Sequence, residues 1–325
     1  MIYPSALRVE TGLVCQLRCP LCPTTRNENL EVLGRGIMKF ENFKRLLDQN
    51  PQIKTIELAN FGEVLLNKDL PQILQYAHDK GVTTTIDEGT NMNTASDEVL
   101  EALVKYQTLV VRCAIDGITQ KAYEQYWVGG NLRNVIQNIQ KLNEFKEKYG
   151  SEKPRLIFQF VIFGHNEHQI EAAIRLSKIL KMELFFKLNF YTNALKVVDR
   201  ERVRQYVGAA DRDEYLEESG KHYKRHQCYE MWNRPQINWD GKLVGCSRNF
   251  WGTYAENVFE GSLEDHLNNE RIESARETLM GRQPARPDMP CLKCGVYQSM
   301  VQTGHWITPE EIQENALTLQ EWLPA

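Results

Sequence analysis

The sequence predicts an α/β protein whose strands run parallel and are joined by crossover helices. Strand-like and helix-like segments alternate from about residue 7 to about residue 195, an order typical of repeated βα units. The 325 residues, 42% of them hydrophobic and 25% charged, provide material for about two domains with sizeable cores. The third observation is that the chain contains eight cysteines. In a reducing compartment, clustered cysteines act as metal ligands or catalytic thiols before they form disulfides.

Composition and charge exclude several classes of protein. The formal net charge of −4 means that the chain lacks the basic field that would hold a nucleic-acid backbone. No uninterrupted apolar run approaches the ~20 residues that span a bilayer. The first residues also lack the charged region and apolar stretch of a signal peptide. We therefore expect a cytoplasmic, globular protein without a nucleic-acid or membrane partner.

The alternating elements can be placed in order along the chain. Strand candidates cover residues 7–11, 53–58, 83–87, 109–115, 156–162 and 184–190. Helical patterns lie between them, near residues 40–48, 69–80, 96–106, 131–148 and 167–180. The third strand candidate opens with a β-branched run, which favours an extended backbone. Residues 196–227 are highly charged and are interpreted as a surface helix and linker, with an active-site lid as the minority alternative.

Three cysteines form a tight group on the loop that leaves the first strand candidate. Cys15, Cys19 and Cys22 have the spacing C-x3-C-x2-C. With no histidine nearby, they cannot complete a tetrahedral zinc site locally. They can hold three irons of a cubane iron–sulfur cluster and leave the fourth iron open to another ligand. A zinc knuckle with a distant fourth ligand, or three unrelated thiols, are the structural alternatives.

The segment that follows this loop resembles the radical S-adenosylmethionine (radical SAM) superfamily. After the second strand candidate come Phe61-Gly62-Glu63 and a Leu-Leu-Asn-x-Asp-Leu run. In that family the cysteine loop holds a [4Fe–4S] cluster whose open iron chelates SAM, and a Gly-Gly-Glu segment contacts the SAM amino group. Here Phe61 replaces the first glycine. Gly62 still allows close backbone approach, and Glu63 still supplies an acceptor for an ammonium group.

Two later strand ends extend the resemblance. Thr90-Asn91 stands where the family commonly has a Thr-Asn-Gly turn, and Ala114-Ile115-Asp116-Gly117 stands where it has Ser-Ile-Asp-Gly. The resemblance therefore implies that Thr90, Asn91, Ala114 and Asp116 line the SAM site. Because Ala114 lacks the serine hydroxyl that often contacts SAM, another group is expected to take its place.

The resemblance also implies a fold and a division into domains. Residues 1–195 are expected to form a partial (β/α)6 TIM-like barrel, with 196–227 as the linker and 228–325 as a small α+β domain with a C-terminal helix. As in full barrels, the carboxyl ends of the strands are expected to carry the site. The cysteine loop, Glu63, Glu88 and Asp116 all lie at or just beyond such ends.

A second cysteine set lies in the last third of the chain. Cys228-x12-Gly241-x4-Cys246 is followed by Cys291-x2-Cys294. Four thiolates from separated segments suit either zinc or a closed iron–sulfur cluster. After a radical SAM barrel, the arrangement resembles the twitch domain, a shortened SPASM domain. It implies one auxiliary [4Fe–4S] cluster held by all four cysteines, with a role in electron transfer.

Local signals place these cysteines on a hairpin and between helices. Asp240-Gly241 is a two-residue turn signal that puts Cys246 at the end of the return strand. Ser262 is the expected N-cap of a helix that runs to about Leu279.

The eighth cysteine, Cys113, lies in the fourth strand candidate. It is interpreted as a small buried hydrophobe, with a hydrogen-atom donor to a substrate radical as the functional alternative. Alternation places Cys113 on the face opposite Ala114 and Asp116, which argues against the donor role.

The resemblance implies reductive cleavage of SAM to a 5′-deoxyadenosyl radical that removes a hydrogen atom from the substrate. We expect an oxidative reaction, dehydrogenase-like or bond-forming, with the auxiliary cluster as electron acceptor. A flavodoxin or ferredoxin is the implied reducing partner, and the substrate is a small molecule or a peptide. Glu88, Asp87, Lys187 and Arg248 are candidates for the base that takes the departing proton.

Two alternatives remain open. The first is modification of a ribosomal peptide by epimerisation or cross-linking; since only 14 residues precede Cys15, we expect no N-terminal leader-binding domain. The second is a non-catalytic scaffold stabilised by zinc. A zinc scaffold would explain seven of the cysteines but not Gly62-Glu63, Thr90-Asn91 or residues 114–117 at successive strand ends.

Overall fold

The computed structural model describes residues 1–189 and 195–321. Within these ranges eight strands form one sheet, in the order β6-β5-β4-β3-β2-β1-β7-β8. The first six in sequence each pair in parallel with the next, so the predicted parallel α/β fold is confirmed. These strands are β1 (Ala6–Val9), β2 (Thr55–Glu57), β3 (Thr83–Thr90), β4 (Val110–Ala114), β5 (Arg155–Ile162) and β6 (Glu183–Leu188). Phe190, the predicted end of the sixth strand, lies outside the described residues.

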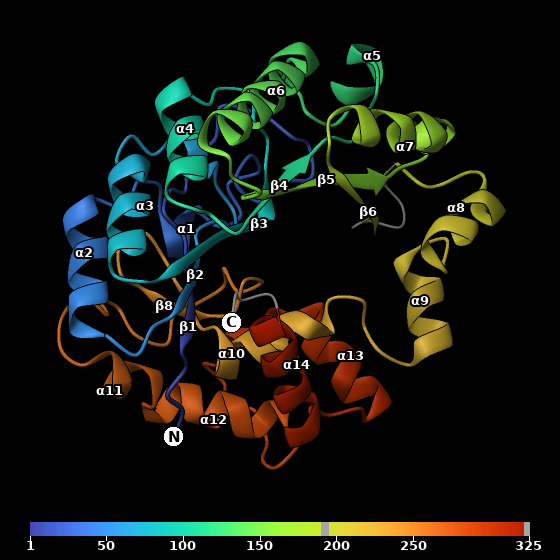
Figure 1. Cartoon of the computed structure of the whole chain (residues 1–325). Helices are drawn as coiled ribbons and strands as arrows, with labels where there is room; N and C mark the ends of the chain where they lie inside the picture. Colours follow the sequence, from blue (N-terminus) through green and yellow to red (C-terminus); the bar gives the residue numbers. More distant parts are fainter. Residues whose placement is uncertain (190–194, 322–325) are drawn as a thin grey trace.

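Helices follow the strands and cover the outer face of the sheet in an arc (Figure 1). The five predicted helices are present, and the fifth begins with a short 3-10 turn. The elements of this part are α1 (Leu30–Leu33), α2 (Phe40–Gln49), η1 (Val64–Leu66), α3 (Leu70–Asp79), α4 (Asp97–Lys105), α5 (Gln120–Tyr123), α6 (Leu132–Tyr149), η2 (Glu167–Gln169) and α7 (Ile170–Ile179). No helix in the described ranges is both long and apolar enough to cross a membrane.

The last third of the chain lies against the same sheet. Its strand β7 pairs in parallel with β1, with Arg8 opposite Gln236, and in antiparallel fashion with β8. The hairpin therefore continues the barrel sheet, while the domain boundaries remain a prediction. The elements are α8 (Arg200–Val207), α9 (Arg212–Ser219), η3 (Arg225–Tyr229), α10 (Glu230–Asn233), β7 (Gln236–Ile237), β8 (Leu243–Gly245), α11 (Leu263–Leu267), α12 (Glu270–Leu279), η4 (Pro290–Lys293), α13 (Gly295–Thr303) and α14 (Pro309–Glu321).

Two local predictions in this region were wrong in detail. The hairpin loop has five residues, 238–242, rather than two, because the Asp240 carboxylate accepts hydrogen bonds from the Asn238 side chain and the Lys242 N–H and so closes a wider loop. The helix that Ser262 caps ends at Leu267. Asn269 then caps a new helix by accepting two backbone N–H groups, which divides the predicted helix in two.

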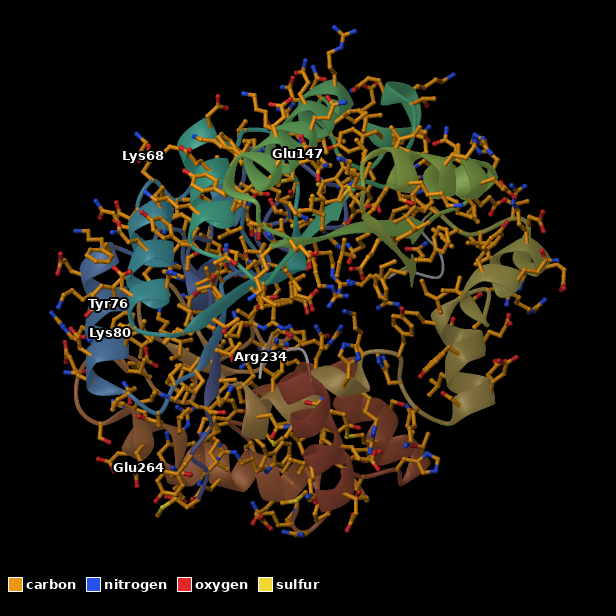
Figure 2. The ribbon with its side chains drawn as sticks, in the orientation of Figure 1. Lys68, Tyr76, Lys80, Glu147, Arg234 and Glu264 are labelled. Carbon is orange, nitrogen blue, oxygen red and sulfur yellow. The ribbon has the colours of Figure 1, made fainter. Side chains whose placement is uncertain are left out.

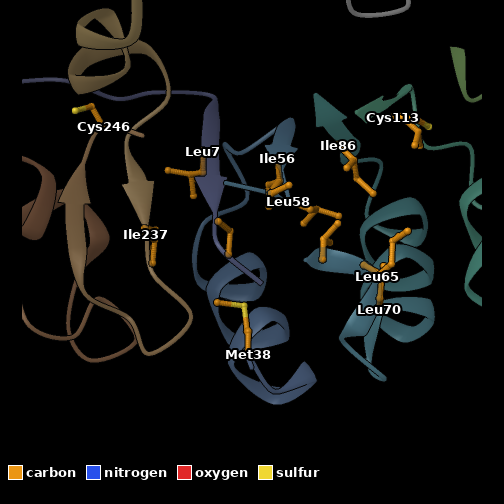
Figure 3. Close-up of a cluster of buried hydrophobic side chains, with 14 of the residues drawn as sticks. Leu7, Met38, Ile56, Leu58, Leu65, Leu70, Ile86, Cys113, Ile237 and Cys246 are labelled. Carbon is orange, nitrogen blue, oxygen red and sulfur yellow. The ribbon is translucent and has the colours of Figure 1, made fainter. Parts of the chain in front are cut away.

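The core lies between the sheet and its outer helices. Figure 3 shows Leu7, Ile56, Ile86 and Ile237, from four neighbouring strands, in one buried cluster. Cys113 belongs to the same cluster and is completely buried. The interpretation of this cysteine as a core residue therefore agrees with its position.

A buried ion network joins the barrel to the C-terminal part. Arg8 on β1 is only 1% exposed, and it lies 2.8 Å from the Glu230 carboxylate, 3.4 Å from Glu88 and 4.0 Å from Glu57. Burial alone would lower the pKa of the guanidinium, but the three carboxylates raise it, so Arg8 stays charged. Because Glu230 belongs to α10, this arginine holds the two parts of the chain together.

Other labelled charges belong to ion pairs at the surface. Lys80, at the edge of the view in Figure 2, pairs with Asp48, and Glu147 pairs with Lys181. Such pairs contribute little to stability. Arg234 lies near the centre and reaches Glu230 at 3.4 Å, so it extends the buried network.

Arg8→Met should lower the free energy of unfolding by about 3–5 kcal/mol, because it leaves buried carboxylates without a counter-charge. Arg155→Met is the matched control on another strand: Arg155 pairs with Glu183, and both side chains are largely exposed, so its loss should cost less than about 1 kcal/mol. Urea unfolding measures both. Equal effects would contradict the central role of Arg8.

Candidate active site

A cavity of about 700 Å³ opens at the carboxyl ends of the strands. It is bordered by the cysteine loop, by the ends of the barrel strands and by residues of the C-terminal part. Most of the residues that the sequence suggested for the cofactor and the chemistry line this one cavity. They are Cys15, Cys19, Cys22, Phe61, Gly62, Glu63, Glu88, Thr90, Asn91, Ala114, Asp116, Lys187 and Arg248.

The chemistry of the cysteine loop fits an iron–sulfur cluster. Cys15, Cys19 and Cys22 are free thiols at the cavity wall. The Leu17 N–H and the Asn91 side-chain amide donate to the Cys15 sulfur at 3.5 and 3.7 Å, as donors around a cluster thiolate do. Burial raises the pKa of Cys15 to about 12. A thiol in this setting therefore needs a positively charged partner, such as iron, to become the thiolate that ligates.

Glu63 organises the neighbouring turn. Its carboxylate accepts hydrogen bonds from the Thr90 hydroxyl at 2.5 Å, from the Asn91 N–H at 2.7 Å and from the Leu65 N–H at 3.2 Å. Donors of the protein itself thus occupy three of the about four acceptor positions of the Glu63 carboxylate. Glu63 fixes Thr90 and Asn91 at the cavity wall, and its contact with a SAM ammonium group remains a prediction.

Glu10, which sequence reasoning missed, holds the Phe61-Gly62 segment. The buried carboxylate accepts the Phe61 N–H at 2.6 Å and the Gly62 N–H at 3.4 Å. A Cβ atom on Gly62 would lie 1.7 Å from the Gly12 carbonyl oxygen, so glycine is required by this close approach of two loops. The signal that could have found Glu10 is a lone carboxylate at the end of an apolar strand.

Gln159 is a second missed residue, and it lies beside Ala114. The two residues are paired across β4 and β5, and a Cβ atom on Gly89 would be 3.7 Å from the Gln159 amide nitrogen and 3.8 Å from the Ala114 Cβ. A polar side chain is therefore present where the family serine is absent. A single glutamine inside an otherwise apolar strand was the available signal.

Asp116, two residues after Ala114, is held by β5 and by a tryptophan. Its carboxylate accepts the Val161 N–H at 2.6 Å and the Trp127 indole N–H at 3.0 Å. Burial raises the pKa of Asp116 to about 7.

Three of the four candidates for the base line the large cavity, and one does not. Glu88, Lys187 and Arg248 line the cavity, whereas Asp87 faces a separate cavity and pairs with Arg112 at 2.6 Å. Burial would raise the pKa of Glu88, but Lys224, Arg8 and Lys187 hold it well below its usual range. Cys113 is not among the residues that line the cavity, and its burial in the core offers no path to a substrate radical.

The four late cysteines surround a second, smaller cavity. Cys228, Cys246, Cys291 and Cys294 all line it, and the Tyr254 hydroxyl lies 3.7 Å from the Cys291 sulfur. Among the described residues, no group of three His, Cys, Asp or Glu side chains is arranged to hold a single metal ion. Four thiols that line one cavity are the donor set of a [4Fe–4S] cluster in which every iron has a protein ligand.

The two cavities share a wall. Gln227, Arg248 and Trp251 line both of them. The cysteine quartet is therefore separated from the large cavity by single side chains.

Comparison with known proteins agrees with this arrangement. Residues 228–295 match the SPASM family, an iron–sulfur cluster-binding domain. A curated relative from Pyrococcus furiosus, the tungsten-containing aldehyde ferredoxin oxidoreductase cofactor-modifying protein, is 25% identical over 292 residues, which cover 83% of this chain and 78% of the relative.

Two solved structures show the same fold. Streptococcus suis SuiB bound to S-adenosylmethionine has a TM-score of 0.64 and 17% identity, over 91% of this chain and 72% of SuiB. BtrN in complex with AdoMet and 2-DOIA has a TM-score of 0.52 and 16% identity, over 90% of this chain and 93% of BtrN. The chain thus shares the fold of these two structures, and its residues 228–295 match the SPASM domain.

The matched domain model describes iron–sulfur cluster binding, and both solved structures were determined with SAM bound. The zinc scaffold is not supported, since the domain model that matches the cysteine quartet describes iron–sulfur cluster binding.

Gly62→Ala should lower the free energy of unfolding by about 3 kcal/mol or more, because the new methyl group meets a backbone carbonyl that cannot move aside. Gly12→Ala is the matched control from the same contact: its Cβ would meet only the Ile37 side chain, at 3.8 Å, and should change stability by less than about 1 kcal/mol. Urea unfolding compares the two. A tolerated Gly62→Ala would refute the packing argument.

Glu10→Gln should change how stability depends on pH. Burial raises the pKa of Glu10 from 4.5 to about 7 in the folded chain, so the folded state binds this proton more tightly than the unfolded state. The resulting stabilisation is complete below about pH 4.5 and is lost as the pH rises through about 7. Unfolding midpoints at several pH values should fall less steeply for Glu10→Gln than for the wild type. Parallel curves would contradict the assignment.

Proposed function

We propose that the protein is a radical SAM oxidase: it removes a hydrogen atom from a substrate in the large cavity and passes the second electron of the oxidation to an auxiliary cluster. Cys15, Cys19 and Cys22 would hold the SAM-binding [4Fe–4S] cluster, and the quartet at Cys228, Cys246, Cys291 and Cys294 would hold the auxiliary one. When bound, these groups supply reductive cleavage of SAM to a 5′-deoxyadenosyl radical and an acceptor for the second electron.

The chain's own residues would hold SAM along one wall of the cavity. Thr90 and Asn91 are fixed there by Glu63, and Asp116 is fixed by Val161 and Trp127. Beside Ala114, the Gln159 amide is our candidate for the contact that a serine makes elsewhere in the family. Phe61-Gly62, held by Glu10, completes this wall.

The observation that carries the oxidative proposal is the shared wall between the two cavities. Gln227, Arg248 and Trp251 separate the quartet from the substrate space. A cluster held by the quartet would supply an electron acceptor next to the substrate space. Epimerisation needs no such acceptor for a second electron, so the arrangement favours oxidation.

An oxidation also releases a proton, and Glu88 is our candidate to accept it. It lines the cavity, and neighbouring cations keep it ionised at neutral pH. A carboxylate with so low a pKa holds a proton weakly. We therefore expect Glu88 to pass the proton on rather than to keep it.

A small-molecule substrate is favoured by the relative from Pyrococcus furiosus, whose name describes modification of a cofactor. Peptide modification is the second candidate function. It is supported by the likeness to SuiB bound to its precursor peptide, with a TM-score of 0.62 over 92% of this chain. That likeness extends to the fold alone, since the identity is 15%.

Cysteine variants test the assignment of the two clusters. The wild type, reconstituted without oxygen, should bind about eight irons and form 5′-deoxyadenosine from SAM when reduced. Cys15→Ala should bind about four irons and form none. Cys291→Ala should also bind about four irons but should still form 5′-deoxyadenosine. The measurements are iron analysis, electron paramagnetic resonance and chromatography of the nucleoside.

Cys113→Ala is the control, because Cys113 is a free cysteine outside both cavities. It should bind as much iron and cleave as much SAM as the wild type. If Cys15→Ala still forms 5′-deoxyadenosine, the catalytic cluster has been assigned to the wrong cysteines.

A further inference from the structure

Basic side chains gather at the end of the large cavity that lies next to the cysteine quartet. Lys187 comes from β6, Lys224 from the residue before η3, and Arg248 from the loop after β8, and all three line the cavity. Lys187 is 8% exposed and Lys224 is 4% exposed. The lining also contains the carboxylates of Glu63 and Asp116, and both accept hydrogen bonds from the protein.

The positive charge of this group exceeds the negative charge that faces it. Two lining carboxylates interact with it: Glu88, which also pairs with Arg8 at 3.4 Å, and Asp116, which interacts with Lys187. Arg212 adds a further cation close to both lysines, where it donates to the Leu188 carbonyl at 3.0 Å. Three lining cations and Arg212 therefore face two carboxylates, one of which has another partner.

A bound anion would stabilise this group of like charges. Burial is the main cause that lowers the pKa of both Lys187 and Lys224, and each lysine is also disfavoured by neighbouring cations. The Arg248 Nε atom is buried and has no hydrogen-bond partner among the described residues. Three donors from three separate segments thus converge on a space that can admit a ligand.

We propose that this basic subsite binds a phosphate group of the substrate. A phosphate monoester carries a charge of about −1.5 to −2 at neutral pH and three acceptor oxygens, which matches the three lining cations and Arg212 opposed by the two carboxylates Glu88 and Asp116. A monocarboxylate would neutralise only one of them. The inference rests on the proposed function, since it describes the substrate of that reaction as a phosphorylated small molecule.

The subsite would also orient the substrate. The Lys187 ammonium donates to the side-chain amide oxygen of Gln159 at 3.2 Å, and Gln159 adjoins Ala114, where we expect SAM. A phosphate held by Lys187, Lys224 and Arg248 would place the rest of the molecule between SAM and the wall shared with the cysteine quartet. The bond to be oxidised would then lie between the two clusters.

Anion binding to the reconstituted protein tests the inference. Calorimetric titration with inorganic pyrophosphate and with inorganic phosphate should show saturable binding, and acetate should bind at least ten-fold more weakly. Lys187→Gln and Lys224→Gln should each weaken pyrophosphate binding about ten-fold or more. Lys224→Arg, which keeps the charge, should retain most of it, and Lys68→Gln, a change at an exposed lysine, should have no effect.

The same samples separate this inference from the proposed function. If SAM is cleaved but neither phosphate probe binds, the phosphate subsite is refuted and the radical SAM assignment stands. Acetate binding as tight as phosphate binding would replace the phosphate with a carboxylate. If pyrophosphate binds in the cavity and 5′-deoxyadenosine never forms, the subsite stands and the proposed function fails. Iron analysis of each variant shows that the protein has kept its fold and its clusters.

Discussion

The rest of the structure depends on the buried ion network around Arg8. One guanidinium on the first strand meets Glu57, Glu88 and Glu230, which come from two further strands and from the C-terminal part. Burying these charges is costly, and only their mutual attraction and hydrogen bonds offset that cost. The network therefore defines one relative placement of the barrel and the SPASM domain. That placement brings the cysteine quartet against the large cavity, which the proposed oxidation requires.

Buried carboxylates play the same part around the cavity itself. Glu10 fixes the loop at Phe61-Gly62, and Glu63 fixes the turn at Thr90-Asn91, in both cases by accepting backbone N–H groups. Loops at the ends of parallel strands have few partners of their own, so each needs a side chain that satisfies its amides. Within this wall, the main role of the buried acidic residues is to hold the loops in place, rather than to present charge to a ligand.

The fold and the cysteine sites could be predicted because their signals are local. Spacing alone groups Cys15 with Cys22, and alternation alone separates Cys113 from Ala114. The side chains that complete the cavity could not be found in this way. Lys224 stands in a charged segment that the sequence assigns to the surface, and Gln159 owes its importance to the residue across the strand pair. Such roles arise from contacts between distant segments.

Asp87 and Glu88 are neighbours in the sequence, but only Glu88 lines the large cavity. Both were candidates for the base, because both stand at the end of one strand. Successive side chains of a strand point to opposite faces, so only one of them can reach the cavity. Asp87 pairs with Arg112 outside the cavity. Arg8, Lys187 and Lys224 keep Glu88 ionised at the cavity wall. The basic residues around Glu88 thus account both for its charge and for the anion that the cavity is suited to bind.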